Sequence, residues 1–307
     1  MTELALFGTD LFGEVVRPKA SGPVAERFTL PPFTLLDGRS GEWQERKRAW
    51  NAMGIRGEVG RDAAAIHCPN QGAVGGLEDA NYTSVFDATM CELAYRWFSP
   101  AGGQVVDPFA GGSVRGIVAG ALGRHYWGCD LRREQVAANH EQADEIAPTV
   151  RPVWVCGDSM ETLPTAPAAD FVFSCPPYGD LEKYSDDPRD LSAMDWHAFV
   201  AAYKRIILRA VGKMKPDTFA CFVVGDFRDG RGFYRNFVST TIEAFEECGA
   251  RLYNEAILAT PVGTAAMRVT KQFESGRKLA KTHQNVLVFC KGDWRAAAAK
   301  CNGIGNA

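Results

Sequence analysis

Three aspartates end three consecutive apolar runs, in VVDPFAGGSVRG (105–116), HYWGCDL (125–131) and PVWVCGD (152–158). After Asp107, a glycine-containing turn opens a helix, where free backbone N–H groups can hold a carboxylate or a phosphate. Asp130 follows 23 residues later, a spacing at which an acidic side chain holds ribose hydroxyls. A helix cap or a turn explains any one of these aspartates, but the three together predict a binding edge for a ribose-bearing ligand.

A fourth apolar run ends in FSCPPYGD (173–180), which joins a thiol, a proline doublet, an aromatic ring and a glycine. Proline removes a ladder donor and fixes φ, so this doublet predicts a stiff exit from a strand. We call residues 174–179 the hook.

A sheet must position these residues. Seven runs predict strands, at 104–109, 125–131, 152–158, 170–175, 219–227, 252–260 and 284–290. Most are continuously apolar, as parallel strands covered on both faces are. Helical patterns alternate with them, notably at 191–215, ended by Pro216, and at 234–249, ended by Gly249. The alternation predicts an α/β fold, a Rossmann-like seven-stranded mostly parallel sheet with helices on both faces plus an N-terminal extension, which binds ligands at the carboxyl ends of its strands.

The first 80 residues fit this alternation poorly. Residues 17–41 are rich in proline and glycine, and 41–61 form a basic, Trp-bearing segment that we expect to be helical between Trp43 and Met53. We predict an N-terminal arm over 1–80, one α/β domain over 81–293 and a frayed C-terminal tail over 294–307. Within the domain, residues 261–283 make a long basic connection, and such loops are often functional.

The turn and the hook together resemble a known pair of motifs. DPFAGGS followed by SCPPY is similar to the DPF-x-G-S-G and Asp/Asn/Ser-Pro-Pro-Tyr/Phe motifs of S-adenosylmethionine-dependent methyltransferases that act on exocyclic amino groups of DNA bases, as in phage and bacterial modification enzymes. The resemblance covers residues 82–292. It implies S-adenosyl-L-methionine as the cofactor and DNA as the partner, and it makes 81–293 the methyltransferase domain.

The resemblance also implies which residues form the site. The cofactor is expected to contact Phe86, Asp107, Pro108, Phe109, Ala110, Gly111, Gly112, Ser113, Asp130, Leu131, Gly157, Asp158 and Ser159. The target base is expected to contact Ser174, Cys175, Pro176, Pro177 and Tyr178.

The implied reaction is site-specific methylation of cytosine N4 or adenine N6, as in DNA modification and restriction-modification. Such an amine is a poor nucleophile because its lone pair is delocalised into the ring. The base is flipped out of the duplex at a cost of a few kcal/mol, and stacking on Tyr178 recovers ~1–3 kcal/mol. Rigid Pro176 and Pro177 would aim main-chain carbonyls at the amine.

The first position of the catalytic motif departs from the family, because Cys175 stands where Asp, Asn or Ser is usual. A thiol is a weak acceptor, so a main-chain carbonyl or Ser174 must take the second hydrogen bond. The motif therefore does not decide between adenine and cytosine as the target base. Cys175 as a nucleophile for C5-methylation and Cys175 as an inert thiol are alternative interpretations. An RNA or tRNA base methyltransferase and a catalytically silent DNA-binding relative are alternative functions.

Two basic segments, 41–61 and 261–283, are predicted to contact phosphates. Such contacts provide affinity but do not select a nucleotide sequence. The alternative is that both segments are solvated surfaces that bind no ligand. An acidic segment after the hook, 178–192, is predicted to form a lid. The candidate DNA-binding residues are Arg46 and Arg48 in the first basic segment, and Arg268, Lys271, Arg277, Lys278 and Lys281 in the second.

The composition of the whole chain indicates in which cellular compartment the protein is expected. The 307 residues carry a formal charge of −3 and nine scattered cysteines without a C-x-x-C pair. This pattern predicts a reducing cytoplasm with neither disulfides nor a zinc cluster. The resemblance implies that this cytoplasm is bacterial or that of a phage-infected host. No apolar run approaches the ~20 residues of a membrane span, and the acidic N-terminus predicts no export signal. His67–Cys68 lacks a second ligand pair, so we expect no metal there. A homodimer stays open.

Overall fold

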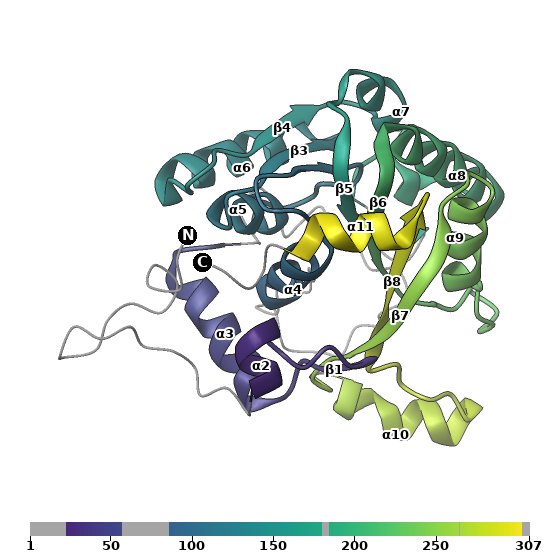
Figure 1. Cartoon of the computed structure of the whole chain (residues 1–307). Helices are drawn as coiled ribbons and strands as arrows, with labels where there is room; N and C mark the ends of the chain where they lie inside the picture. Colours follow the sequence, from purple (N-terminus) through teal and green to yellow (C-terminus); the bar gives the residue numbers. More distant parts are fainter. Residues whose placement is uncertain (1–22, 57–85, 180–183, 264, 303–307) are drawn as a thin grey trace.

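The computed structural model describes residues 23–56, 86–179, 184–263 and 265–302. One eight-stranded sheet crosses it in the order β1-β7-β8-β6-β5-β2-β3-β4 (Figure 1). β8 is antiparallel to β6 and β7, and the other pairs are parallel. The predicted α/β fold with a mostly parallel sheet is confirmed, but the sheet has eight strands instead of seven. The strands are β1 Leu35–Asp37, β2 Gln104–Asp107, β3 His125–Asp130, β4 Val153–Cys156, β5 Ala169–Ser174, β6 Met214–Val224, β7 Arg251–Ala259 and β8 His283–Lys291.

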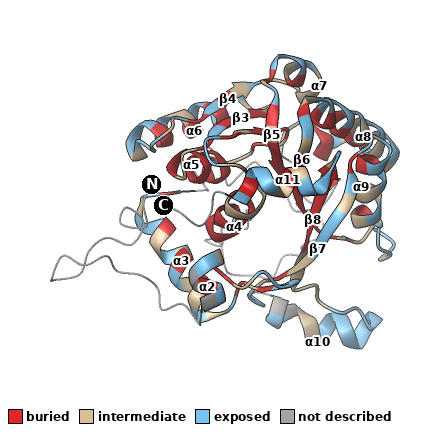
Figure 2. Cartoon of the chain, in the orientation of Figure 1, coloured by how far each residue is buried: buried red, intermediate tan, exposed pale blue. Residues whose placement is uncertain are grey.

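Helices cover both faces of the sheet. Side chains alternate along each strand, so on β5 Phe171 and Phe173 enter one core while Val172 enters the other. Residues of α3, α4, α5, α6 and α11 pack in the first core, and residues of α8 and α9 pack in the second (Figure 2). The helices are α2 Pro23–Phe28, α3 Gly41–Ala52, α4 Ala88–Phe98, α5 Val114–Ala121, α6 Arg133–Ile146, α7 Ser159–Thr162, α8 Trp196–Lys213, α9 Phe237–Glu246, α10 Ala265–Gly276 and α11 Trp294–Cys301.

The additional strand, β1, comes from the segment expected to be an extended arm. It pairs with β7 in parallel, with Leu36 opposite Leu258. α3 follows, capped by Ser40, and buries Trp43 and Trp50 completely in the first core. Residues 35–52 are therefore part of the packed body of the protein.

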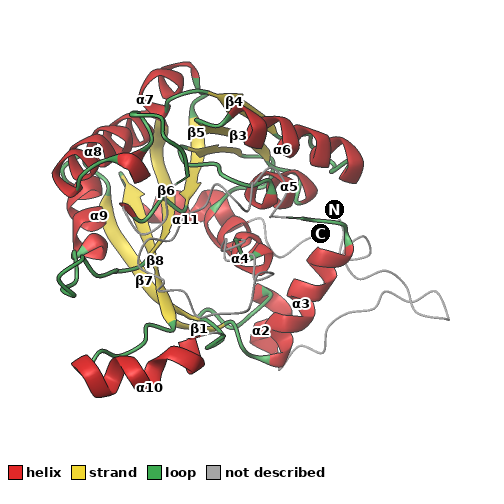
Figure 3. Cartoon of the chain, turned by 180° about the vertical axis from the view of Figure 1, so that it is seen from behind, coloured by secondary structure: helices red, strands yellow, loops and turns green. Residues whose placement is uncertain are grey.

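Three segments in the second half of the chain also differ from expectation. The predicted loop 261–283 contains α10, which stands apart from the sheet in both views (Figures 1 and 3). The predicted frayed tail contains α11, because Ala297 and Cys301 are buried in the first core. The helix predicted to end at Pro216 ends at Lys213, and Pro216 lies inside β6, where the register of β6 with β5 shifts. Such an irregularity tolerates a proline because no ladder donor is needed there.

The parallel pairing fixes where ligands can bind. β2, β3, β4 and β5 run in the same direction, so their carboxyl ends meet at one edge of the sheet. This edge carries the glycine turn after β2 and the hook after β5.

Candidate active site

The glycine turn is held by the aspartate that ends the next strand. Asp130 accepts one hydrogen bond from the backbone N–H of Gly111, at 3.0 Å, and one from that of Arg132, at 2.9 Å. Gly111 has φ +51°, a left-handed conformation that favours glycine. Each carboxylate oxygen accepts one of these bonds and keeps further acceptor capacity for a ligand. Burial raises the pKa of Asp130 above its usual value, although the two N–H donors oppose the shift.

Asp107 has a structural role, which corrects the expectation that it contacts the cofactor. It is completely buried and does not line the cavity described below. Oδ2 accepts from Arg115 Nε at 2.6 Å and from the hydroxyl of Tyr126 at 2.8 Å. Oδ1 accepts from the backbone N–H of Phe109 at 3.0 Å and from the hydroxyl of Ser174 at 2.5 Å. All four hydrogen-bond donors to the Asp107 carboxylate are groups of the protein itself.

The third aspartate opens α7. Asp158 caps this helix by accepting from the backbone N–H of Met160 at 2.8 Å. The next residue, Ser159, donates its hydroxyl proton to the carbonyl of Pro108 at 2.5 Å. The loop after β4 is therefore fastened to the turn after β2, and both border the same space.

The hook places Tyr178 between the interior and this space. Its ring is partly buried, with edge contacts to Phe227 and Phe237 at centroid distances of 6.0 Å. Its hydroxyl accepts a hydrogen bond from Gln284 Nε2 at 2.7 Å. Burial, and the neighbouring thiol of Cys175, raise the pKa of Tyr178 well above its usual value. Tyr178 is therefore a fixed, neutral aromatic side chain.

One cavity of about 380 Å³ runs from the glycine turn to the hook. A volume of this order is that of a small-molecule site. Asp107, Ala110, Ser113 and Ser174 were expected in the site but are buried outside the lining. The predicted residues that line the cavity are Phe86, Pro108, Phe109, Gly111, Gly112, Asp130, Leu131, Gly157, Asp158 and Ser159 at one end, and Cys175, Pro176, Pro177 and Tyr178 at the other.

Sequence reasoning missed several lining residues. Arg115 also donates to the carbonyls of Phe109 and Ala110, at 2.5 and 2.9 Å, and so fixes the turn. A lone arginine in the apolar helix VRGIVAGA was a usable signal for this role. Gln284 carried no comparable signal, because it lies 106 positions from Tyr178.

The predicted lid contributes to the cavity through its described part. Tyr184, Arg189 and Asp190 line it. Asp190 also caps the following turn, since its carboxylate accepts from the backbone N–H and the hydroxyl of Ser192. Residues 180–183 lie outside the described part of the chain.

The predicted phosphate contacts divide into buried and exposed residues. Arg46 is buried and donates to Glu92 at 2.9 Å, so its side chain does not reach a polymer; this prediction is wrong. Lys281 is half-buried. The side chain of Arg268 lies outside the described residues. The remaining candidates, Arg48, Lys271, Arg277 and Lys278, are exposed.

Other predictions concern chemistry elsewhere in the molecule. Among the described residues, eight cysteines form no disulfide, and no group of three or more His, Cys, Asp or Glu side chains could hold a metal ion. His67 and Cys68 lie outside the described residues. None of the described helices is both long enough and apolar enough to cross a membrane.

Comparison of the sequence with family models and with curated proteins gives no match. Similar solved structures include TrmN from Thermus thermophilus (12% identity, TM-score 0.46, 67% of this chain and 49% of that one). Precorrin-6y C5,15-methyltransferase from Geobacter metallireducens is also similar, with 11% identity and a TM-score of 0.43 over 66% of this chain and 88% of that one. Magnesium protoporphyrin IX methyltransferase from Synechocystis has 10% identity and a TM-score of 0.40 over 63% of this chain and 71% of that one. The matched part thus spans about half of TrmN. These distant likenesses carry no argument about activity, so the function is argued from the site.

The fold and the cavity define an α/β protein with a cavity at the carboxyl edge of a doubly wound sheet.

Proposed function

We propose that this protein is an S-adenosylmethionine-dependent methyltransferase that modifies the exocyclic amine of adenine or cytosine in DNA. One observation carries the proposal: a single cavity joins the glycine turn, with Gly111 and Asp130, to the hook, with Pro176, Pro177 and Tyr178. A donor bound at one end and a base bound at the other would share one enclosed space.

The turn end suits the cofactor. Asp130 presents carboxylate oxygens that can accept hydrogen bonds from two ribose hydroxyls, and Gly111 lets the main chain approach closely. Asp158 and Ser159 border the same end and offer polar atoms to an adenine edge. Apolar walls come from Phe86, whose ring lies 4.8 Å from the guanidinium carbon of Arg115.

The hook end suits a planar amine. Pro176 and Pro177 have no N–H, so this part of the backbone offers carbonyl acceptors only. Tyr178 offers a ring whose edge contacts and hydrogen bond to Gln284 fix its orientation. Ser174 was the other candidate acceptor, but its hydroxyl is buried against Asp107. The acceptors that remain are main-chain carbonyls and the thiol of Cys175.

These residues would serve the transfer by position. When bound, S-adenosylmethionine supplies an electrophilic methyl group whose leaving group is a neutral thioether. Carbonyls at Pro176 and Pro177 hold the amine hydrogens, which directs the nitrogen lone pair out of the ring plane. Transfer would join the amine nitrogen to the methyl carbon as the bond from that carbon to sulfur breaks; sulfur would keep the electron pair, and the amine would release one proton to water. Holding both reactants in register is the main contribution of the protein.

A second candidate function, a catalytically silent nucleic-acid-binding relative, is favoured by Cys175. Its thiol is a weaker acceptor than the Asp, Asn or Ser that the resembling motif carries. Such a protein would keep the cofactor end and the hook but would transfer no methyl group.

The test is incubation with tritiated cofactor and duplex DNA, single-stranded DNA or tRNA, followed by mass spectrometry of the nucleosides. The expected product is N4-methylcytosine or N6-methyladenine from DNA. Tritium found in tRNA alone would show that the substrate is RNA instead of DNA. A C5-methylcytosine product would indicate that Cys175 acts as a nucleophile. Cofactor binding without transfer to any nucleic acid would select the silent relative.

A further inference from the structure

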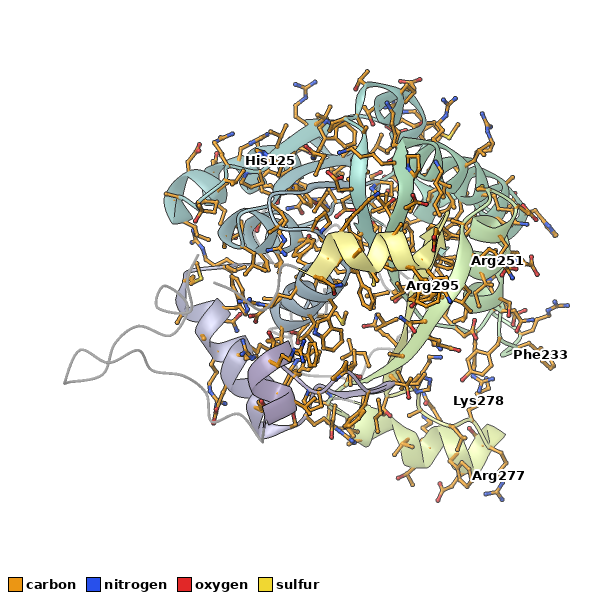
Figure 4. The ribbon with its side chains drawn as sticks, viewed as in Figure 1. His125, Phe233, Arg251, Arg277, Lys278 and Arg295 are labelled. Atoms are coloured by element: carbon orange, nitrogen blue, oxygen red, sulfur yellow. The ribbon has the colours of Figure 1, made fainter. Side chains whose placement is uncertain are left out.

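The loop between β6 and α9 carries exposed aromatic side chains. Phe233 is 71% exposed and Tyr234 is 41% exposed. Figure 4 shows Phe233 on the margin of the molecule that also carries Lys278 and Arg277. A phenylalanine this exposed buries little apolar area and contributes little to the hydrophobic core.

Hydrogen bonds make this loop rigid. Asp229 N–H donates to the carbonyl of Phe233 at 2.8 Å, and Phe233 N–H donates to the carboxylate of Asp229 at 2.9 Å. Arg228 forms an isolated antiparallel bridge with Tyr234 and donates to the carbonyl of Gly232 at 2.9 Å. The aromatic side chains are therefore presented on a fixed turn, which lowers the entropic cost of binding a ligand.

Cations lie beside Tyr234 and the turn. The guanidinium carbon of Arg228 lies 4.0 Å from the centre of the Tyr234 ring, and Nζ of Lys281 lies 5.9 Å from it. Lys278, just beyond α10, contacts the turn so closely that a Cβ on Gly232 would lie 2.7 Å from its Nζ. Two chain segments far apart in sequence therefore supply one basic, aromatic surface.

Asp229 and Asp226 lie near these cations, and each accepts a hydrogen bond from the backbone. Asp229 accepts from Phe233 N–H and Arg231 N–H, and Arg231 Nε lies 3.4 Å from its carboxylate. Asp226, which acts on Lys281, accepts from the backbone N–H of Val238 at 3.1 Å. Arg228, Arg231, Lys278 and Lys281 outnumber these two carboxylates, so the surface has a positive excess, which complements a polyanion.

This surface adjoins the hook. A Cβ on Gly225 would lie 3.6 Å from Cε of Lys281 and 3.9 Å from the hydroxyl oxygen of Tyr178. Lys281 thus lies near both Tyr178 and Tyr234. A strand whose target base enters the cavity would place its neighbouring nucleotides over the loop.

Resting on the function proposed above, we infer that Phe233, Tyr234, Arg228, Lys278 and Lys281 form a binding platform for the unpaired nucleotides that flank the target base. A flanking base stacks on Phe233, while Lys278 and Lys281 hold the phosphates beside it. In a duplex the faces of the bases are covered by their neighbours, so an exposed ring of this kind favours a locally opened or single strand.

The test compares Phe233→Ala with Phe33→Ala, which removes a phenylalanine of matching exposure, 70%, elsewhere on the surface. Binding of a fluorescein-labelled 20-nucleotide single strand of mixed sequence is measured by anisotropy, with RNA of the same sequence in a parallel arm. Loss of one stacked base should weaken binding about 5- to 150-fold for Phe233→Ala, and Phe33→Ala should bind like the wild type. Lys278→Gln should lower the slope of log affinity against log salt by about 0.7.

The outcomes separate this inference from the proposed function. If wild type methylates DNA, and Phe233→Ala binds and methylates equally well, the platform is wrong while the methyltransferase stands. If single-strand binding depends on Phe233 but no nucleic acid is methylated, the platform stands and the methyltransferase is wrong. Wild type that binds no nucleic acid overturns both. Preference for the RNA arm supports the platform and makes RNA its occupant. Unchanged melting temperature and cofactor affinity show that each variant is folded.

Discussion

The hydroxyl of Ser174 donates to Oδ1 of Asp107 at 2.5 Å, and both side chains are completely buried. Ser174 is the last residue of β5, immediately before Cys175, and Asp107 is the last residue of β2, immediately before the glycine turn. Through Arg115, the same carboxylate is coupled to the carbonyls of that turn. The two ends of the cavity are therefore fixed to each other by one buried carboxylate.

Ser174→Ala should loosen this connection. Asp107 loses a buried donor, which costs about 1–2 kcal/mol of unfolding free energy, measurable by urea denaturation. Methyl transfer should fall more than cofactor affinity, because the hook loses its alignment with the turn. Thr241→Val, which removes a buried hydroxyl bonded to Tyr203, is the control and should lower stability alone. Equal transfer by Ser174→Ala and wild type would show that the bond is only structural.

Tyr178→Ala should abolish methyl transfer while cofactor affinity, measured by isothermal titration calorimetry, stays nearly intact. Tyr178 lines the hook end of the cavity, and stacking on such a ring contributes ~1–3 kcal/mol per base. Tyr178→Phe keeps the ring but removes the hydroxyl, and with it the hydrogen bond from Gln284 and the interaction with the Cys175 thiol, so transfer should fall by about tenfold or less. Simultaneous loss of cofactor binding in Tyr178→Ala would mean that the two ends of the cavity are not separate sites.

Cofactor affinity should depend on pH through Asp130. Burial raises the pKa of this carboxyl, so as pH falls it takes up a proton earlier than an ordinary aspartate, whose pKa is about 3.9. The ionised form accepts hydrogen bonds best, so affinity should be complete above the raised pKa and should decline as pH falls through it. Asp130→Asn should bind weakly and remove this pH dependence. A decline that persists in Asp130→Asn would assign the titration to another group.

The strand pattern was predictable where burial on both faces leaves apolar runs, as in β2, β5 and β8. β7 lies close to its predicted range although most of its residues are exposed or only partly buried. β1 was not predictable, because it has only three residues and its pairing partner, β7, lies more than 200 positions away. α11 was missed for a similar reason, since AAAAK has no apolar stripe and becomes ordered by packing Ala297 and Cys301 on the core.

The site was predictable to the level of strand ends, but not to the direction of each side chain. Asp107 and Asp130 occupy equivalent places in sequence, yet Asp107 turns inward to Arg115 and Tyr126 while Asp130 reaches the cavity. The difference arises from partners on other elements, which no local pattern encodes. Position in the sequence alone therefore predicted that both aspartates contact the ligand. Of the two, only Asp130 lines the cavity.

Arg46 and Arg48 allow the clearest separation of stability from binding. Both were predicted to contact DNA, but Arg46 is buried on Glu92, which also accepts from Trp50 Nε1 and Arg96 Nε, whereas Arg48 is exposed. Arg46→Ala should lower the unfolding free energy by about 3 kcal/mol, because a buried carboxylate loses one of its two cationic partners.

Neither the affinity of folded Arg46→Ala for DNA nor the dependence of that affinity on salt should change. Arg48→Ala should leave the melting temperature unchanged, since exposed charges contribute little to stability. If Arg48 contacts a phosphate, its removal should reduce the slope of log affinity against log salt by about 0.9 for duplex DNA. A reduced salt slope for Arg46→Ala, with melting unchanged, would place Arg46 at the polymer surface and contradict its burial against Glu92.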